Sequence, residues 1–172
     1  ETAKPTKEVL KVRDLEFIND WGKKMLDKVS FSVRKGEILG IAGVEGNGQK
    51  ELVDMLFGLD RPNVGTIFIN GENMVGMDQL QLRQRRVSLV PEDRMLYGIA
   101  ASATVEENLL SDRCSYKEYN KGLLFHTKAI HEASDQLIQE YQILCKNRNQ
   151  RVGMLSGGNI QKVVVAREFS SH

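Results

Sequence analysis

The first part of the chain alternates between apolar and polar residues, a pattern typical of β-strands that bury one face. Residues 29–33 have this character and predict a half-buried strand. Residues 9–15 and 66–69 are rich in apolar residues and predict two more strands. Residues 38–42 differ because they form a continuous apolar run. Such a run predicts a central strand that is covered on both faces.

Turn residues bound these strands. Asn70-Gly71 follows the third strand and predicts a tight hairpin turn. Residues 87–90 predict one more short strand, which Pro91 ends. A glycine-rich loop at residues 43–48 separates the apolar run from the next predicted helix.

Helical spacing dominates elsewhere. The helix after the glycine-rich loop has apolar residues within 52–57 and ends at Gly58. Thr104 and Glu107 have the spacing of a capping box and predict a helix start. A longer amphipathic helix follows, and its apolar stripe, most simply a core face, comprises Ile130, Ala133, Leu137, Ile138, Tyr141 and Leu144.

Length and charge narrow the class of protein. The chain has 172 residues, enough for a domain with its own core, and a net charge of +1 from 24 basic and 23 acidic residues. This balance gives no argument for nucleic-acid or lipid binding. Cys114 and Cys145 have no metal-ligand spacing, so we expect two free thiols in a reducing compartment. The polar residues 1–8 look like a linker, and the chain does not begin with Met, so we expect an excised piece.

The order strand, glycine-rich loop and helix makes a cradle for phosphate, because backbone N–H groups and the helix dipole converge on the anion. The competent pattern is G-x-x-x-x-G-K-[ST]. Gly43 and Gly48 match its glycines, whereas Gln49 stands at the lysine position and Lys50 at the hydroxyl position. The candidate phosphate-contacting residues are Gly43, Glu45, Gly46, Asn47, Gly48, Gln49, Lys50 and Glu51.

These replacements predict weak or magnesium-poor nucleotide binding and no efficient hydrolysis at this loop. Gln49 offers only a neutral hydrogen bond, and Lys50 cannot coordinate a cation. Lys50 also cannot replace the missing lysine, because one step along a helix rotates a side chain by about 100°. Glu45 adds negative charge nearby. The alternative is a glycine turn that binds no ligand.

A second phosphate-binding pattern lies at residues 155–162, Leu-Ser-Gly-Gly-Asn-Ile-Gln-Lys, at the head of a helix predicted to reach Phe169. A hydroxyl and backbone N–H groups at a helix start can bind phosphate. The alternative is a Ser-Gly-Gly loop that caps an ordinary helix. The candidate residues of this segment are Ser156, Gly157, Gly158 and Gln161.

Residues 155–162 resemble the LSGGQ signature of ABC (ATP-binding cassette) ATPases, in the form found in sugar and nucleoside importers. Residues 43–52 resemble the second half of importer ATPases that hold two nucleotide-binding domains in one chain. Residues 91–94, Pro-Glu-Asp-Arg, stand where this family has its Q-loop. Residues 121–124 and 141–143 resemble nucleoside importers that work with basic-membrane-lipoprotein receptors.

The resemblance implies an α/β fold: a P-loop ABC ATPase core with an antiparallel β-subdomain and a helical signature subdomain, truncated before the Walker B strand. It implies a linker remnant at 1–8, the ATP-binding core and β-subdomain at 9–99, and the helical subdomain at 100–172. The catalytic Asp-Glu strand and switch histidine of the family are not found, since none of His126, His131 and His172 has the required context. We therefore predict no catalytic and no metal-ligating residues in this chain.

Two further site residues follow from the resemblance. Trp21 lies at about the distance before the loop at which the family places its adenine-stacking aromatic; the alternative is a tryptophan that packs against its neighbours. Glu92 replaces the Q-loop glutamine and would report the nucleotide state to the permease. The alternative for residues 91–94 is an acidic turn with a local ion pair.

The implied cofactors are ATP and Mg²⁺, the latter weak or absent at this half's own loop. The implied partners are the first nucleotide-binding domain of the same chain and the transmembrane permease, with no nucleic acid, and the implied location is peripheral, at the cytoplasmic face of the bacterial inner membrane. Nucleosides are the first choice of cargo and simple sugars the second. The alternatives are a DNA-repair or chromosome-maintenance ATPase, a ribosome-associated ABC protein and a structural pseudo-ATPase.

Overall fold

The computed structural model describes residues 6–113, 116–120, 122 and 124–170. Its contacts divide the chain into two compact units, Glu1–Val87 (unit 1) and Ser88–His172 (unit 2), and each is described by itself. The predicted domain limits at residues 8 and 99 stay predictions, because a compact unit need not coincide with a family subdomain. The predictions for Cys114, His172 and part of residues 121–124 lie outside the described residues.

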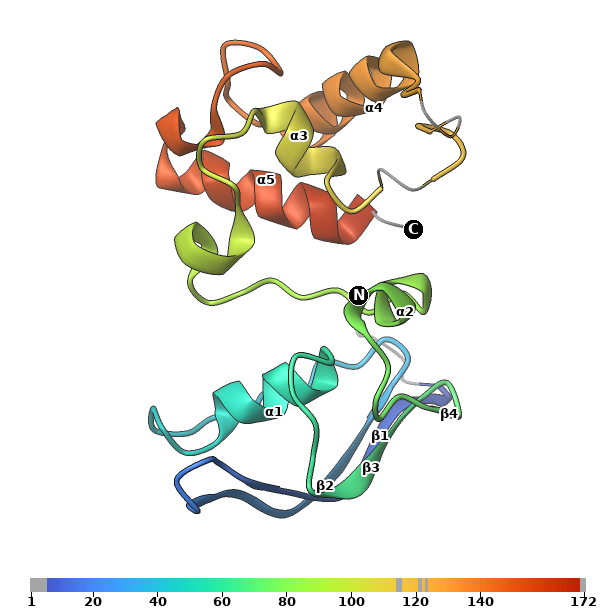
Figure 1. Ribbon diagram of the computed structural model, residues 1–172, viewed down its shortest axis with the longest axis vertical. Coiled ribbons are helices and arrows are strands. Elements are labelled where there is room, and N and C mark those ends of the chain that lie inside the picture. Colours follow the sequence, from blue (N-terminus) through green and yellow to red (C-terminus); the bar gives the residue numbers. More distant parts are fainter. Residues whose placement is uncertain (1–5, 114–115, 121, 123, 171–172) are drawn as a thin grey trace. The chain divides into compact units, whose positions relative to one another are not determined.

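Unit 1 contains a four-stranded antiparallel sheet with the order β2-β1-β3-β4 (Figure 1). Its strands are β1 (Glu8–Ile18), β2 (Lys24–Arg34), β3 (Val64–Ile69) and β4 (Glu72–Asn73). The three strands predicted at residues 9–15, 29–33 and 66–69 are therefore confirmed. Asn70 and Gly71 both have positive φ, 50° and 86°, which fits the tight turn predicted between β3 and β4.

Helix α1 (Gln49–Leu56) packs against this sheet, and helix α2 (Gln79–Gln84) follows β4. Apolar side chains of α1 and the inward positions of the strands form one core, whose buried members are Val12, Leu15, Leu26, Leu52, Met55, Ile67, Met74 and Leu82. The helix predicted after the glycine-rich loop is thus confirmed, and Phe57 and Gly58 end it.

The strands predicted at residues 38–42 and 87–90 are not formed. Ile38 is 97% exposed, so the continuous apolar run is not a covered central strand in this structure. The physical reason is that a central strand depends on backbone hydrogen bonds from neighbours on both sides. No strand of the described residues pairs with either segment.

Unit 2 is helical. It contains a π-helical turn η1 (Arg94–Gly98), α3 (Val105–Leu110), α4 (Thr127–Glu140), a 3₁₀ turn η2 (Val152–Met154) and α5 (Gly157–Ser170). The predicted capping box is confirmed, since the Thr104 hydroxyl accepts from the Glu107 N–H and the Glu107 carboxylate accepts from the Thr104 N–H. A single core joins the helices through Val105, Leu109, Leu110, Leu137, Ile143, Val152, Ile160, Val163 and Ala166.

The apolar stripe predicted on α4 is confirmed except at its last member. Leu137 is buried and most of the other members pack against the same core. Leu144 is 74% exposed, because α4 ends at Glu140 and Gln142 turns the chain with φ 52°. Cys145 is a free thiol whose pKa is raised by burial and by the nearby Asp135 carboxylate. In the described part of the chain, none of the helices combines the length and apolar character needed to cross a membrane.

Candidate functional site

The glycine-rich loop in unit 1 forms a turn that is exposed to solvent. The N–H of Asn47 donates to the carbonyl of Val44 over 3.2 Å, and Gly46 takes φ 84°, a conformation that favours glycine. Residues 43–47 are exposed. The backbone of the turn is therefore accessible to a ligand from solvent.

Gly48 anchors this loop to the sheet. It precedes α1 with φ 93°, and a Cβ at this position would lie 2.5 Å from the carbonyl oxygen of Met25 in β2. Only glycine satisfies both the backbone conformation and the space. The close approach sets the N-terminus of α1 against the start of β2.

The side chain of Gln49 folds back over the loop. A Cβ on Gly43 would overlap the Gln49 side-chain amide, so the two residues are in direct contact across the turn. The position that holds a cationic lysine in the competent pattern thus presents a neutral amide above Gly43. It can offer a hydrogen bond to phosphate but no charge.

Lys50 is engaged elsewhere. Its ammonium nitrogen lies 2.5 Å from a carboxylate oxygen of Asp54, one turn further along α1. This i,i+4 pair has the ordinary geometry of an exposed helix surface. In this structure the positive charge lies along the outside of α1.

Trp21 lies in the connection between β1 and β2. The Asn19 side chain accepts hydrogen bonds from the N–H groups of Trp21 and Lys23, which holds the turn. The indole is 90% exposed, so the alternative of a tryptophan packed on its neighbours is wrong. β2 begins just after this turn, and its residue Met25 lies against Gly48 at the end of the glycine-rich loop. The stacking of adenine on Trp21 stays a prediction.

In unit 2, residues 91–94 lead into η1. Asp93 accepts hydrogen bonds from the N–H groups of Met95 and Leu96, so it caps this turn. Among the described residues the structure gives neither Glu92 nor Arg94 an ion pair, which argues against a local ion pair as their role. The Arg94 guanidinium instead lies 3.7 Å from the position of a Cβ on Gly157.

The segment Ser156-Gly157-Gly158 is exposed at the start of α5. The first N–H groups of a helix have no partner within the helix, so they are available to an anion. Four buried apolar residues attach α5 to the rest of unit 2: Ile160, Val163, Val164 and Ala166. Gln161 is exposed on the same helix, one turn from the segment.

Asn159 is a further residue of this segment that was not among the predicted site residues. The Asn159 side chain donates from Nδ2 to the Ser156 hydroxyl over 2.9 Å and accepts at Oδ1 from the Leu144 N–H over 2.8 Å. The spacing Ser-x-x-Asn allows such a bond at a helix start, which was a usable signal. The hydrogen bond between Asn159 and Leu144, which is 15 residues away, had no signal in the sequence.

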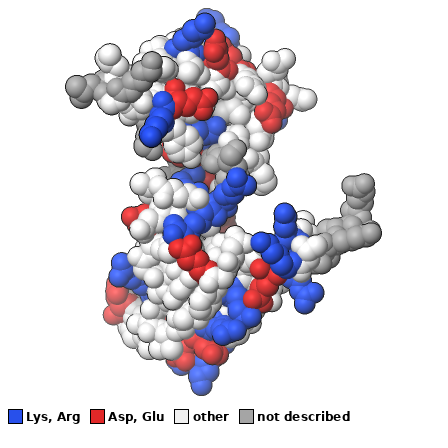
Figure 2. Space-filling view, turned by 90° about the vertical axis from the view of Figure 1, so that its right-hand side faces the viewer, with Lys and Arg blue, Asp and Glu red and all other residues white. Residues whose placement is uncertain are grey.

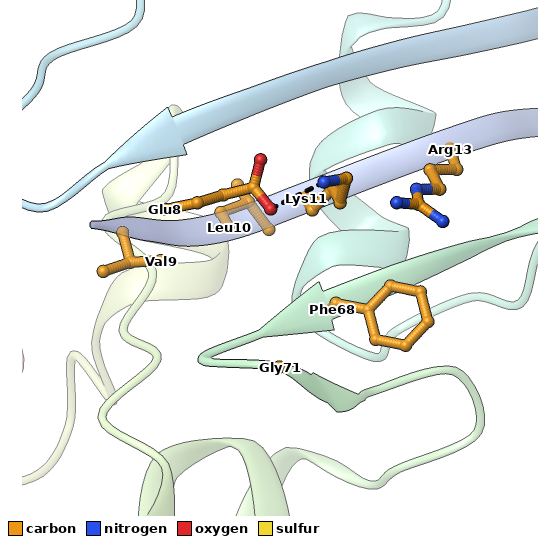
Figure 3. Close-up of a pocket in the computed structure, with 7 residues that line it drawn as sticks. All are labelled: Glu8, Val9, Leu10, Lys11, Arg13, Phe68 and Gly71. Carbon is orange, nitrogen blue, oxygen red and sulfur yellow. Dashed lines mark hydrogen bonds and ion pairs between the residues drawn. The ribbon is translucent and has the colours of Figure 1, made fainter.

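Unit 1 also has a groove of about 230 Å³ (Figure 3). It is lined by Glu8, Val9, Leu10, Lys11, Arg13, Phe68 and Gly71. Within it, the Lys11 ammonium lies 2.8 Å from a carboxylate oxygen of Glu8, and its hydrogen bond lowers the pKa of Glu8. None of the predicted site residues lines the groove, so it is not the predicted phosphate site. Within the residues that the structure describes, no three His, Cys, Asp or Glu side chains are grouped to hold a metal ion.

Two curated relatives show what the sequence is similar to. The chain is 43% identical over 143 residues to the ribose import ATP-binding protein RbsA of Cereibacter sphaeroides, covering 83% of this chain and 28% of that protein. It is 32% identical over 167 residues to the guanosine import ATP-binding protein NupO of Bacillus subtilis, covering 97% of this chain and 33% of that protein. The chain thus spans about a third of the length of the curated relatives it matches.

Solved structures show the fold. The ATP-binding cassette MJ1267 of an ABC transporter, in its ADP conformation, matches with a TM-score of 0.74 and 22% identity over 96% of this chain and 66% of that chain. The ATP-binding cassette MJ0796, in a dimeric post-hydrolysis state with ADP and Pi, matches with a TM-score of 0.73 and 20% identity over 94% and 69%. The predicted α/β cassette fold is confirmed.

A family model described as ABC transporter matches residues 26–172, which include both glycine-rich segments. The relatives named above are import ATP-binding proteins for a sugar and a nucleoside, the class whose motifs the sequence resembles. The chain belongs to the ABC transporter family.

Proposed function

We propose that this chain is the second nucleotide-binding half of an importer ATPase that couples ATP binding and hydrolysis to the uptake of nucleosides or simple sugars. The observation on which the proposal rests is the exposed Ser156-Gly157-Gly158 segment at the head of α5, in a chain similar to import ATP-binding proteins. A hydroxyl and free N–H groups at a helix start suit the terminal phosphate of ATP.

The proposed mechanism places two ATP molecules between two nucleotide-binding domains of one full-length chain. Ser156 and the two following glycines would complete the site built on the phosphate loop of the first domain. That site would hydrolyse ATP, because phosphoryl transfer depends on positioned charge around the phosphate. The present chain contributes the donors of its signature, whereas the catalytic groups of that site belong to the other half.

The glycine-rich loop of this half would form the second site. Its backbone N–H groups can approach phosphate, while Gln49 supplies no charge and Lys50 no Mg²⁺ ligand. We propose that this site holds nucleotide weakly, or closes without turnover, so that the two sites differ in function. Trp21, 90% exposed in the same unit, is the proposed platform for the adenine ring.

The segment around Glu92 would connect the nucleotide state to the permease. Support comes from Arg94, whose guanidinium lies beside Gly157 at the head of α5, so that residues 91–94 and the signature are adjacent in unit 2. Glu92 is exposed and remains available to a partner. An exposed charge can contribute to the recognition of a partner surface of opposite charge.

The proposed partners are the first nucleotide-binding domain and the transmembrane permease, and the proposed location is the cytoplasmic face of the bacterial inner membrane. We propose no nucleic-acid partner. Acidic and basic residues are mixed on the face shown in Figure 2, without the one-sided basic surface expected of a DNA-repair or ribosome-associated ATPase.

Reconstitution tests this function against the structural pseudo-ATPase. The full-length protein and its permease would be placed in lipid vesicles, and ATP-dependent uptake of radiolabelled guanosine and ribose would be measured separately. Uptake of either, accompanied by ATP hydrolysis, supports the proposal, and the better substrate identifies the class of cargo. Association with the permease without any ATP-dependent uptake would favour the scaffold.

A further inference from the structure

Asn159 is held at a fixed point of unit 2. Ile143 is buried in the helical core, which fixes the backbone of the loop after α4. The adjacent Leu144 turns its side chain to solvent and offers its N–H to Asn159. Because Ile143 fixes the backbone of Leu144, the hydrogen bond from the Leu144 N–H restricts the Asn159 side chain to one position.

The chemistry of the donors settles which way the Asn159 amide points. The Leu144 N–H can only donate, so the Asn159 atom 2.8 Å away must be the oxygen. The NH₂ group therefore faces Ser156, whose hydroxyl oxygen it approaches to 2.9 Å. Since NH₂ can only donate, the Ser156 oxygen is the acceptor of that bond.

Consequently the Ser156 hydroxyl keeps its own proton free. Within the described part of the chain, Asn159 is the one hydrogen-bond partner given to the exposed Ser156 hydroxyl. A hydroxyl that accepts one bond becomes a better donor of the next, because the bonds polarise each other. The arrangement thus prepares Ser156 to donate to an anionic oxygen.

We infer that Asn159 is a positioning residue for the signature: it orients the Ser156 hydroxyl as a hydrogen-bond donor toward the terminal phosphate of ATP. It acts through Ser156 and need not touch nucleotide itself. This inference rests on the proposed function, since it requires that the head of α5 faces a triphosphate.

Asn159→Asp is the sharpest variant. A carboxylate can still accept from the Leu144 N–H, so the attachment of the loop is retained. The second oxygen, however, can only accept, so it accepts a hydrogen bond from the Ser156 hydroxyl and adds negative charge near the phosphate. ATPase activity of the full-length protein should fall more in this variant than in Asn159→Ala, for which we expect a loss of about tenfold, the size typical of one lost hydrogen bond.

Lys162→Met provides a matched control. The Lys162 ammonium donates to the carbonyl of Gln142 over 2.7 Å, so it attaches the same loop to the same helix without contacting Ser156. If Asn159 mattered only as a structural attachment, Lys162→Met would lower activity similarly. We expect kcat and KM within about twofold of the parent, the range of a near-neutral surface change. Thermal unfolding of each variant reports whether unit 2 remains folded.

A double-mutant cycle completes the test. If Asn159 acts through Ser156, adding Asn159→Ala to Ser156→Ala should change ATPase activity no further. The inference is overturned if Asn159→Ala lowers activity by the same factor in both backgrounds, or if Asn159→Asp is as active as the parent while Ser156→Ala is impaired. Full activity of Ser156→Ala would instead refute the proposed function, and the inference with it.

Discussion

The two glycine-containing segments of this chain differ in how they are supported. The segment at Ser156 heads a 14-residue helix that packs into the core of its own unit, and the Asn159 side-chain amide donates a hydrogen bond to the Ser156 hydroxyl. The loop at residues 43–48 precedes an 8-residue helix and follows an apolar run that forms no strand. Local packing defines the first segment, whereas the second depends on strand pairing that the described residues do not supply.

The side chains follow the same division. Ser156 is free to donate outward, while Gln49 folds over Gly43 and Lys50 pairs with Asp54. A phosphate would meet ordered donors at the signature and a neutral amide at the loop. This difference supports the proposal that the two segments bind phosphate with different strength.

The largest expected effect is at the signature. Gly157→Asp in the full-length protein should lower ATPase activity by at least about 100-fold, because it places a negative charge where donors to the phosphate are needed. A Cβ at Gly157 meets only the Arg94 guanidinium at 3.7 Å, so the fold should tolerate the change. Steady-state ATPase assays, with Gly157→Ala as the control for size, would check this. Comparable activity of Gly157→Asp and the parent would show that the signature segment does not supply donors to the phosphate, contrary to the contrast drawn with the loop at residues 43–48.

The next effect concerns the loop's anchor. Gly48→Ala should destabilise unit 1 by about 1–3 kcal/mol, because a strained φ and the close Met25 carbonyl both oppose a Cβ. Gly46→Ala is the matched control: its φ is also positive, 84°, but nothing lies within 4 Å of the added Cβ. Chemical denaturation would measure both. Equal costs would show that the contact with β2 does not fix the loop.

A smaller effect is expected beside the signature. Thr104→Ala removes the cap of α3, which shares the core of α5, and should destabilise unit 2 by about 1 kcal/mol. Unit 1 should be unaffected. Hydrogen exchange, which reports on each unit separately, would detect the difference.

The same capping box gives a pH dependence. Hydrogen bonds from the Thr104 backbone and side chain lower the pKa of Glu107 below its usual value of 4.5. The folded pKa is therefore below the unfolded one, so the contribution to stability is present above pH 4.5 and is lost as the pH falls through the folded pKa. Glu107→Gln should flatten this part of the stability profile in acid denaturation. An unchanged profile would contradict the role of the carboxylate.

The smallest effect is expected at Gln49. Gln49→Lys should change ATPase activity of the full-length protein by less than about twofold, because a charged hydrogen bond alone does not replace the absent Mg²⁺ ligand. Gln49→Met is the control that removes the amide at similar size. A large gain from lysine would show that the loop was limited by that charge alone.

Local signals explain which elements the sequence predicts correctly. The turn at Asn70-Gly71 and the capping box at Thr104 depend on residues close together in the chain, and they formed as predicted. The strands β1 to β3 also formed where their side-chain pattern predicted them, although β1 pairs with the distant β3. The strand at residues 38–42 depends on distant partners, so apolar content alone predicted it wrongly. The prediction that Leu144 belongs to the core was wrong for a related reason, because a turn that hydrophobic periodicity does not detect ends α4 before it.

The candidate site shows the same limit. The glycines and Ser156 were recognisable because phosphate chemistry requires them at fixed spacing. Asn159 was missed because its role depends on the Leu144 N–H, and the proximity of Arg94 to Gly157 likewise joins segments that are far apart in sequence.

The central claim is that the loop at residues 43–50 lacks the groups that make nucleotide binding depend on magnesium. Isothermal titration of the chain with ATP, once with excess Mg²⁺ and once with a chelator, tests it directly. We predict weak binding whose affinity changes by less than about twofold between the two conditions, which is below 0.5 kcal/mol. A tenfold or greater gain in affinity with Mg²⁺ would show that the loop does bind nucleotide together with the metal.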